Sequence, residues 1–198
     1  MDQNNPMKIG VLVLAAGRST RFGSDKRIAA LADGAQVLHT QLDQIAVARL
    51  PVHVCLHPDD DALAAQLLQR GTPCRRYEKA KEGMGGTLAQ AIGHVEAWDG
   101  VLIALADMPW IQAGTYRSVA HLLGRERICV PTYSGKRGHP VGFCRQYYVE
   151  LSEIAGQAGA RKILAKYPDD VHEVEVDDPA IHWDIDVPAD ITLDRSKV

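Results

Sequence analysis

The hydrophobic positions of the chain form short runs that alternate with longer segments of helical spacing. Apolar runs of strand length occupy residues 9–14, 52–56, 101–106 and 128–130. Apolar residues recur at helical spacing in segments 37–48, 62–69, 87–98 and 116–123. The alternation predicts an α/β fold, in which helices cover both faces of a doubly wound, mostly parallel sheet.

The last third of the chain follows a different order. A glycine-rich turn at 134–138 precedes a short apolar run at 141–144, which predicts a small antiparallel excursion of the sheet. Helical spacing then covers 146–167, and a strand candidate lies at 171–176. No internal repeat, low-complexity tract or linker interrupts the sequence, so we expect a single domain over residues 1–198.

Size and charge limit the possible functions. The 198 residues suffice to bury the core of one α/β domain without disulfides. With 25 acidic and 22 basic residues, the net charge of −3 gives no support to general binding of nucleic acid or of a membrane surface. Any anion-binding site must therefore be local.

Cysteine usage and the N-terminal residues indicate a cytoplasmic protein. The four cysteines form no CxxC pair and are expected to be buried thiols; they are Cys55, Cys74, Cys129 and Cys144. The first residues, MDQNNPM, lack the basic and apolar regions of a signal peptide, and no apolar run reaches the ~18 residues of a membrane span.

The segment that follows the first apolar run has the composition of a triphosphate-binding loop. It reads LAAGRSTRFGSDK over residues 14–26. Its small residues allow backbone N–H groups to approach an anion closely, and Arg21 and Lys26 supply the positive charge that a polyphosphate needs. Neither the Walker motif nor the GxGxxG fingerprint is present. The alternative interpretation is an ordinary strand-to-helix turn with two surface cations.

A carboxylate follows the third apolar run. Asp107 lies directly after residues 101–106 and precedes Met108 and Pro109. In a parallel sheet this position faces the same crevice as the loop after the first strand, where a carboxylate could hold Mg²⁺ beside the phosphates. A turn-forming aspartate before a proline is the alternative.

A second acidic motif, WDIDVPAD, lies at residues 183–190. Alternation along an extended segment places Asp184 and Asp186 on the same side, so that one carboxylate could reach a metal while the other stabilises its surroundings. Asp190 is expected to cap a C-terminal helix or to lie in its first turn.

Six motifs together resemble one enzyme family. LAAGRSTRFGSDK, EGMGGTLAQAI, LADMP, GHPVGF, GARKIL and DIDVPADI occur in this order and cover almost the whole chain. They resemble the molybdenum cofactor cytidylyltransferases, nucleotidyltransferases that build a dinucleotide form of the cofactor. The related guanylyltransferases more often carry LAGG in the first motif, so the resemblance favours CTP over GTP.

The resemblance implies a Rossmann-like nucleotidyltransferase fold and a specific reaction. CMP would pass from CTP to the terminal phosphate of molybdopterin, pyrophosphate would leave, and Mg²⁺ would be the cofactor. A molybdenum hydroxylase would be a transient partner, with no role for nucleic acid or a membrane. A cytidylyl- or sugar-phosphate nucleotidyltransferase with another acceptor, a guanylyltransferase, and a non-catalytic carrier of the molybdenum cofactor remain as alternatives.

The same resemblance assigns roles to individual residues. The expected nucleotide contacts are Leu14, Ala15, Ala16, Gly17, Ser19, Arg21, Lys26, Gly83, Gly85, Gly86, Thr87 and Asp107. Arg21, Lys26 and Asp107 would be catalytic, and Asp107 and Asp186 would bind the metal. The acceptor would contact Gly138, His139 and Pro140. Two alternatives are that Thr87 merely caps a helix and that His139 is an ordinary packed or exposed histidine.

Other polar residues are expected to serve the structure. His53 and His57 lie four residues apart in and after a predicted strand, without the helix that a zinc pair needs. The acids at 59–61 are expected in the first turn of a helix, and Tyr147 and Tyr148 are expected to pack at a helix start. Asp25 stands before Lys26 where the family often has proline, which predicts a less rigid loop.

Overall fold

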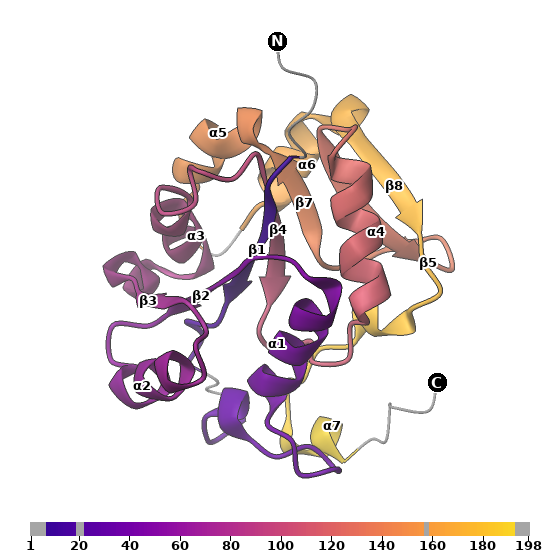
Figure 1. Ribbon diagram of the computed structural model, residues 1–198. Helices are drawn as coiled ribbons and strands as arrows, with labels where there is room; N and C mark the ends of the chain where they lie inside the picture. The colour runs from indigo at the N-terminus through magenta and orange to yellow at the C-terminus, as the bar shows by residue number, and fades with distance from the viewer. Residues whose placement is uncertain (1–6, 19–21, 157–158, 193–198) are drawn as a thin grey trace.

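The computed structural model describes residues 7–18, 22–156 and 159–192, and their strands form one eight-stranded sheet (Figure 1). The strand order is β3-β2-β1-β4-β7-β5-β6, and β8 also pairs with β5. The strands are β1 (Ile9–Leu14), β2 (Val52–Leu56), β3 (Cys74–Arg76), β4 (Gly100–Leu105), β5 (Ile128–Tyr133), β6 (Lys136–Arg137), β7 (Val141–Cys144) and β8 (Val171–Glu175).

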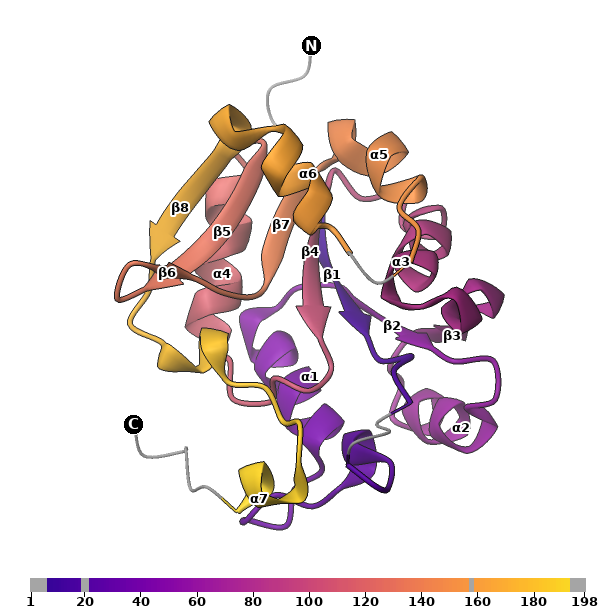
Figure 2. The same ribbon diagram turned by 180° about the vertical axis from the view of Figure 1, so that it is seen from behind.

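Helices cover both faces of this sheet (Figures 1 and 2). The α-helices are α1 (Val37–Ala48), α2 (Asp61–Gln69), α3 (Met84–Ile92), α4 (Ala113–Leu123), α5 (Tyr148–Ser152), α6 (Arg161–Lys166) and α7 (Pro188–Ile191). The 3-10 helices are η1 (Lys26–Ile28), η2 (Glu78–Glu82), η3 (Arg145–Tyr147), η4 (Pro168–Asp170) and η5 (Pro179–His182). None of the described helices is both long enough and apolar enough to cross a membrane.

The pairing of the strands confirms the predicted fold class. β3, β2, β1 and β4 run parallel to one another, and β5 runs parallel to β8. β7 lies between β4 and β5 and is antiparallel to both, and β6 pairs antiparallel with β5. The antiparallel strands are therefore the excursion predicted around the glycine-rich turn.

The side chains of β1 alternate between two cores because successive residues of a strand face opposite sides. Val11 and Val13 pack in one core with α1, α2 and α4, and Leu12 and Leu14 pack in the other with α3, α5 and α6. Each such side chain contributes about 1.5–3 kcal/mol when it is fully buried. A strand that is apolar at every position is thus the signature of a sheet covered on both faces.

Two helix predictions were wrong in extent. The segment predicted as a helix over 87–98 is helical over Met84–Ile92 and continues as turns. The segment predicted over 146–167 is divided into η3, α5 and α6. Gly156 and Gly159 lie between α5 and α6 and adopt φ angles of +71° and +51°, which a continuous helix does not allow. The short strands β3 and β6 had no counterpart among the predicted elements.

Two of the four cysteines and both Tyr147 and Tyr148 are buried, as the sequence predicts. All four cysteines are free thiols, with Cys55 and Cys129 buried and Cys74 and Cys144 partly exposed. Tyr147 and Tyr148 are buried against the core that contains α3.

The C-terminal segment returns from β8 across the carboxyl ends of the central strands (Figure 2). Asp178, only 2% exposed, anchors this return. Its carboxylate accepts hydrogen bonds from the Gln112 N–H at 2.9 Å, from Thr115 Oγ1 at 2.6 Å and from the Ala180 N–H at 3.1 Å. Residues 183–190 are thereby brought to the same edge of the sheet as the loop after β1.

The contact between β1 and Trp98 gives a first prediction. A Cβ atom at Gly10 would lie 2.4–2.5 Å from ring atoms of Trp98. Gly10→Ala is therefore expected to lower the free energy of unfolding by about 1–3 kcal/mol, measured by urea denaturation. The control is Gly114→Ala in α4, where the added methyl meets open space, and which should stay within about 1 kcal/mol of the unmodified protein. Equal stability of the two variants would contradict the tight packing at Gly10.

Candidate functional site

A cavity of about 560 Å³ opens at the carboxyl ends of β1 and β4. Its walls come from the loop after β1, η1, the loop after β2, the segment from η2 into α3, and the end of β4. The lining residues are Leu14, Ala15, Ala16, Gly17, Arg18, Lys26, Arg27, His57, Ala80, Lys81, Gly83, Met84, Thr87, Leu105, Ala106 and Asp107.

Parallel pairing brings the loop after β1 and the end of β4 together. Leu14 and Leu105 are register partners, and the Ala106 N–H donates to the Leu14 carbonyl at 3.2 Å. On the other side of β1, the Ala15 N–H donates to the Cys55 carbonyl of β2 at 2.9 Å. The predicted phosphate loop and Asp107 therefore share one edge of the sheet, as the strand pattern predicts.

Lys26 connects three segments of the site. Its Nζ donates to Asp107 Oδ2 and to the Ile185 carbonyl, each at 2.7 Å. The Ile185 N–H in turn donates to the Asp107 carbonyl at 2.9 Å. The side chains of Lys26 and Asp107 are 16% and 22% exposed, so this ion pair is only partly screened by water.

The acidic motif near the C-terminus has the predicted alternation. Asp184 and Asp186 are exposed, and Ile185 between them is buried. The Asp190 carboxylate accepts hydrogen bonds from the N–H groups of Asp186 and Val187 at 2.9 Å, which places it in the first turn of α7 as expected. Neither Asp184 nor Asp186 lines the cavity, so metal binding by Asp186 stays a prediction.

One side-chain oxygen of Asp107 is without a partner within the part of the chain that the structure describes. This oxygen, Oδ1, is buried and accepts no hydrogen bond there. Among the described residues, no group of three or more His, Cys, Asp or Glu side chains could hold a metal ion by itself. One carboxylate with an unpaired oxygen suits Mg²⁺, which needs one or two protein carboxylates when phosphates supply further ligands.

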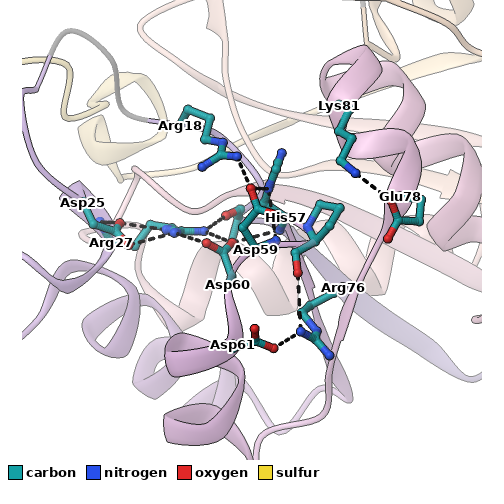
Figure 3. A network of polar contacts seen from close by, with 12 residues as sticks. Arg18, Asp25, Arg27, His57, Asp59, Asp60, Asp61, Arg76, Glu78 and Lys81 are labelled. Carbon is teal, nitrogen blue, oxygen red and sulfur yellow. Dashed lines mark hydrogen bonds and ion pairs between the residues drawn. The ribbon is translucent and has the colours of Figure 1, made fainter.

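A buried guanidinium forms the densest polar network of the site (Figure 3). Arg27 is 7% exposed and pairs with Asp25 and Asp60 through both oxygens of each carboxylate. Burial by itself would lower the pKa of Arg27, but hydrogen bonds to the two carboxylates outweigh it and raise that pKa above its usual value. Burial likewise opposes the charge of Asp60, and Arg27 nevertheless holds the pKa of Asp60 below its usual range.

The loop after β2 supplies a second part of this network. The His57 N–H donates to Asp60 Oδ2 at 2.9 Å, and Asp59 pairs with Arg18 and lies 3.4 Å from His57 Nδ1. Of the acids predicted in a first helical turn, only Asp61 lies inside α2, where it pairs with Arg76. Asp59 and Asp60 instead face residues of the cavity wall.

The two histidines of the β2 region have different surroundings. His53 Nε2 lies 2.8 Å from the Tyr77 hydroxyl, and burial, followed by the charges of His94 and Arg75, lowers the pKa of His53 to about 4. His57 is 5% exposed and lines the cavity.

The glycine-rich segment after η2 contributes only some of its predicted contacts. Gly83 and Thr87 line the cavity, whereas Gly85 and Gly86 do not. A Cβ atom would lie 2.6 Å from the Gly156 carbonyl at Gly85 and 2.3 Å from the Lys79 carbonyl at Gly86, so both glycines permit close backbone packing. Nucleotide contact by Gly85 and Gly86 therefore stays a prediction.

Thr87 is not a helix cap. Helix α3 begins at Met84 after Gly83, so Thr87 lies within its first turn. Its hydroxyl donates to the Gly83 carbonyl at 3.3 Å, and its side chain is buried beside the cavity.

The predicted acceptor residues lie outside this cavity. Gly138 packs against Ile181, and the His139 N–H donates to the Ile181 carbonyl at 3.1 Å. Burial lowers the pKa of His139, and its Nδ1 is buried without a partner among the described residues. Pro140 is buried at the start of β7. Contact of these residues with an acceptor stays a prediction.

Two predicted contacts, Ser19 and Arg21, lie outside the described residues. Conversely, the sequence analysis did not assign four charged or polar cavity residues: Arg18, Arg27, His57 and Lys81. The rule that identified Asp107, a carboxylate just after a parallel strand, applies equally to Asp59 and Asp60 after β2. It could have identified the Arg27 network.

The chain resembles known proteins in sequence and in structure. Residues 11–171 match the family described as the MobA-like NTP transferase domain. No curated protein sequence matches the chain.

The chain is similar to many solved structures, including the following three. Rv0371c from Mycobacterium tuberculosis H37Rv is 28% identical, with 94% of this chain and 96% of that chain covered and a TM-score of 0.83. The complex of Rv0371C with manganese is 26% identical, with coverages of 87% and 89% and a TM-score of 0.74. A nucleotidyl transferase from Methanothermobacter thermautotroptrophicus shares the fold at 17% identity, with both coverages 94% and a TM-score of 0.77.

The Asp60 carboxylate gives a prediction about stability and pH. Asp60→Asn is expected to lower the free energy of unfolding at pH 7 by about 1–3 kcal/mol, because a largely buried ion pair with Arg27 is lost. The pKa of Asp60 is lowered by folding, so its contribution is complete above the pKa of the unfolded chain and is lost as the pH falls through the folded value. The difference between variant and unmodified protein should therefore shrink from pH 7 toward pH 3.

Urea denaturation at several pH values checks this expectation. Asp43→Asn is the control, because the Asp43 carboxylate pairs with Arg70 but is 61% exposed. This variant should change stability by less than about 1 kcal/mol at every pH. A difference for Asp60→Asn that stays constant down to pH 3 would show that the charge of Asp60 is not the cause.

Proposed function

The chain belongs to the MobA-like NTP transferase family and is a nucleotidyltransferase, and from this premise we propose that it transfers CMP from CTP to molybdopterin. The acceptor would be the terminal phosphate of molybdopterin or of the molybdenum cofactor, and pyrophosphate would be the second product. The reaction would take place in the cytoplasm, with a molybdenum hydroxylase as a transient recipient of the product.

One observation carries the proposal. The loop after β1, the ammonium of Lys26 and the carboxylate of Asp107 meet on one wall of a cavity that is large enough for a nucleotide. Pockets for small ligands range from about 300 to 1,000 Å³. Small residues for close approach, a cation for the phosphates and a carboxylate for a hard metal ion are the parts that nucleotidyl transfer requires.

The chemistry would need no nucleophile from the protein. A phosphate oxygen of the acceptor would attack the α-phosphorus of CTP, a new P–O bond would form, and the bond to the β-phosphate would break as pyrophosphate leaves. Backbone N–H groups near Ala16 and Gly17, with Lys26 and Arg21, would hold the β- and γ-phosphates and stabilise the charge that develops on the leaving group.

Asp107 and Asp186 would hold the divalent cation, which we propose to be Mg²⁺. The buried Oδ1 of Asp107, which has no partner in residues 7–18, 22–156 and 159–192, supports this assignment. When bound, the cation would supply neutralisation of phosphate charge. Lys26 Nζ donates to the other oxygen of Asp107, Oδ2, and we expect the lysine side chain to turn toward the phosphates when the nucleotide binds.

The choice of CTP and of the acceptor rests on the motifs of the sequence. LAAG in the loop after β1 and the EGMGGTLAQAI segment favour CTP, and GHPVGF and GARKIL favour a pterin phosphate as acceptor. Thr87 and Gly83 support a base and ribose site at the start of α3, because both line the same cavity as the loop after β1.

Release of pyrophosphate tests the proposal. The protein is incubated with Mg²⁺, molybdenum-loaded molybdopterin and either CTP or GTP, beside a control without acceptor. Release that depends on the acceptor and occurs with CTP alone is the expected result. Release with GTP would make the protein a guanylyltransferase, and binding of nucleotide without release would indicate another acceptor or a carrier.

Lys26 and Asp107 give a prediction for the same assay. Lys26→Met and Asp107→Asn are each expected to lower kcat/KM about 10²–10³-fold in this partly dry site, because the first removes a cation that would bind the phosphates and the second removes a carboxylate that would hold the divalent cation. The control is Lys8→Met, which removes an exposed lysine before β1 at the opposite end of the sheet. Near-normal turnover of Lys26→Met would contradict its assigned role.

A further inference from the structure

Arg27 lines the cavity beside Lys26, but its guanidinium is already paired with carboxylates of the protein. All five of its N–H donors are used. Nε and Nη2 donate to the two oxygens of Asp25 at 2.8 and 2.7 Å, and Nη2 and Nη1 donate to the two oxygens of Asp60 at 2.8 and 2.5 Å. The fifth N–H, on Nη1, donates to the Ala15 carbonyl at 2.5 Å.

These five bonds fix three walls of the cavity to one another. The Ala15 carbonyl belongs to the loop after β1. Asp25 also accepts from the Arg27 N–H at 3.0 Å and caps η1, the turn that carries Lys26. Asp60 also accepts a hydrogen bond from the His57 N–H, which connects the loop after β2 to the guanidinium of Arg27.

The bond to Ala15 also sets the direction of a peptide plane. A trans peptide points its C=O and its N–H in opposite directions. With the Ala15 carbonyl held by Arg27, the N–H of Ala16 is directed away from the guanidinium. A rotation of this peptide would remove one backbone donor from the predicted phosphate cradle.

We propose that Arg27 is a positioning residue for the nucleotide site: its guanidinium fixes the Ala15–Ala16 peptide and the Lys26 turn in the geometry that binds a triphosphate. The proposal rests on the proposed function, since it assumes that the cavity takes a nucleoside triphosphate. Arg27 does not itself bind phosphate, because one guanidinium and two carboxylates leave this group with a net charge of −1.

The first test compares Arg27→Lys with the unmodified protein. Lysine keeps the charge but has three donors on a single atom and cannot bond both carboxylates and the carbonyl together. We expect the variant to bind CTP and inorganic tripolyphosphate at least about tenfold more weakly, by isothermal titration well below its melting temperature. In turnover, KM for the nucleotide should rise more than kcat falls. Arg70→Lys, which alters an exposed pair with Asp43, is the matched control and should bind normally.

A double variant separates geometry from charge. Arg27→Met leaves both carboxylates and a net charge of −2, which would repel a triphosphate whatever the loop geometry. Arg27→Met with Asp60→Asn has the original charge of −1 and retains an acceptor for the His57 N–H, but lacks the guanidinium. We expect its nucleotide affinity to remain at least about tenfold weaker than that of the unmodified protein, even where its stability approaches that of Asp60→Asn.

The outcomes distinguish the two proposals. Normal affinity in Arg27→Lys, or full recovery of affinity in the double variant, would overturn the positioning role and leave the proposed function intact. If the unmodified protein bound neither CTP, GTP nor tripolyphosphate, the proposed function and the positioning role would both fail. Weak binding in both variants, with normal binding in Arg70→Lys, would support the positioning of the cradle by Arg27.

Discussion

The parallel pairing of β1 with β4 is the constraint on which the site depends. Adjacent parallel strands end at the same edge of a sheet, so the loop after β1 and Asp107 must lie side by side. The pairing is secured by apolar side chains that alternate between two cores, one on each face. Because these cores exclude water from both faces, the polar chemistry is confined to the strand ends. The cavity lies there, and the C-terminal segment crosses the same edge.

The two neighbouring cations of this edge have different tasks. Among the described residues, Lys26 forms an ion pair with Asp107 alone. A nucleotide could replace Asp107 with its own phosphates, because an ammonium on a flexible side chain can turn. Arg27 uses a planar fork with five donors, and every donor is bonded to the protein. A lysine that can turn, beside an arginine that holds the surrounding loops in place, suits a phosphate site. The loops held by the arginine need little reorganisation when a ligand binds. The positioning role proposed for Arg27 rests on this difference between the two side chains.

Much of the fold and part of the site could be predicted from the sequence. Runs that are apolar at every position identified the buried central strands, and the small residues after β1 and the carboxylate after β4 identified a wall of the cavity. The helix limits were less accurate, because apolar spacing continues beyond the residues at which turns end the helices, as it does at 93–98 and at 153–156. Arg27 was not identified, since its partners Ala15 and Asp60 are 12 and 33 residues away along the chain. For Gly85 and Gly86, nucleotide contact stays a prediction from the motif, and the structure shows that both glycines pack closely against backbone.

The sequence by itself determined the local elements, the composition of the loop after β1 and the family to which its motifs point. These properties depend on residues that are near one another in the chain, where the periods of 2 and 3.6 and the sizes of side chains suffice. Only the tertiary structure decided which charges meet. Lys26 bonds to Ile185, 159 residues away, and to Asp107, 81 residues away. Such pairs are determined by strand order and by the path of the C-terminal segment. An ion pair across the fold has no periodic signature, because many carboxylates could serve any one cation until packing selects among them.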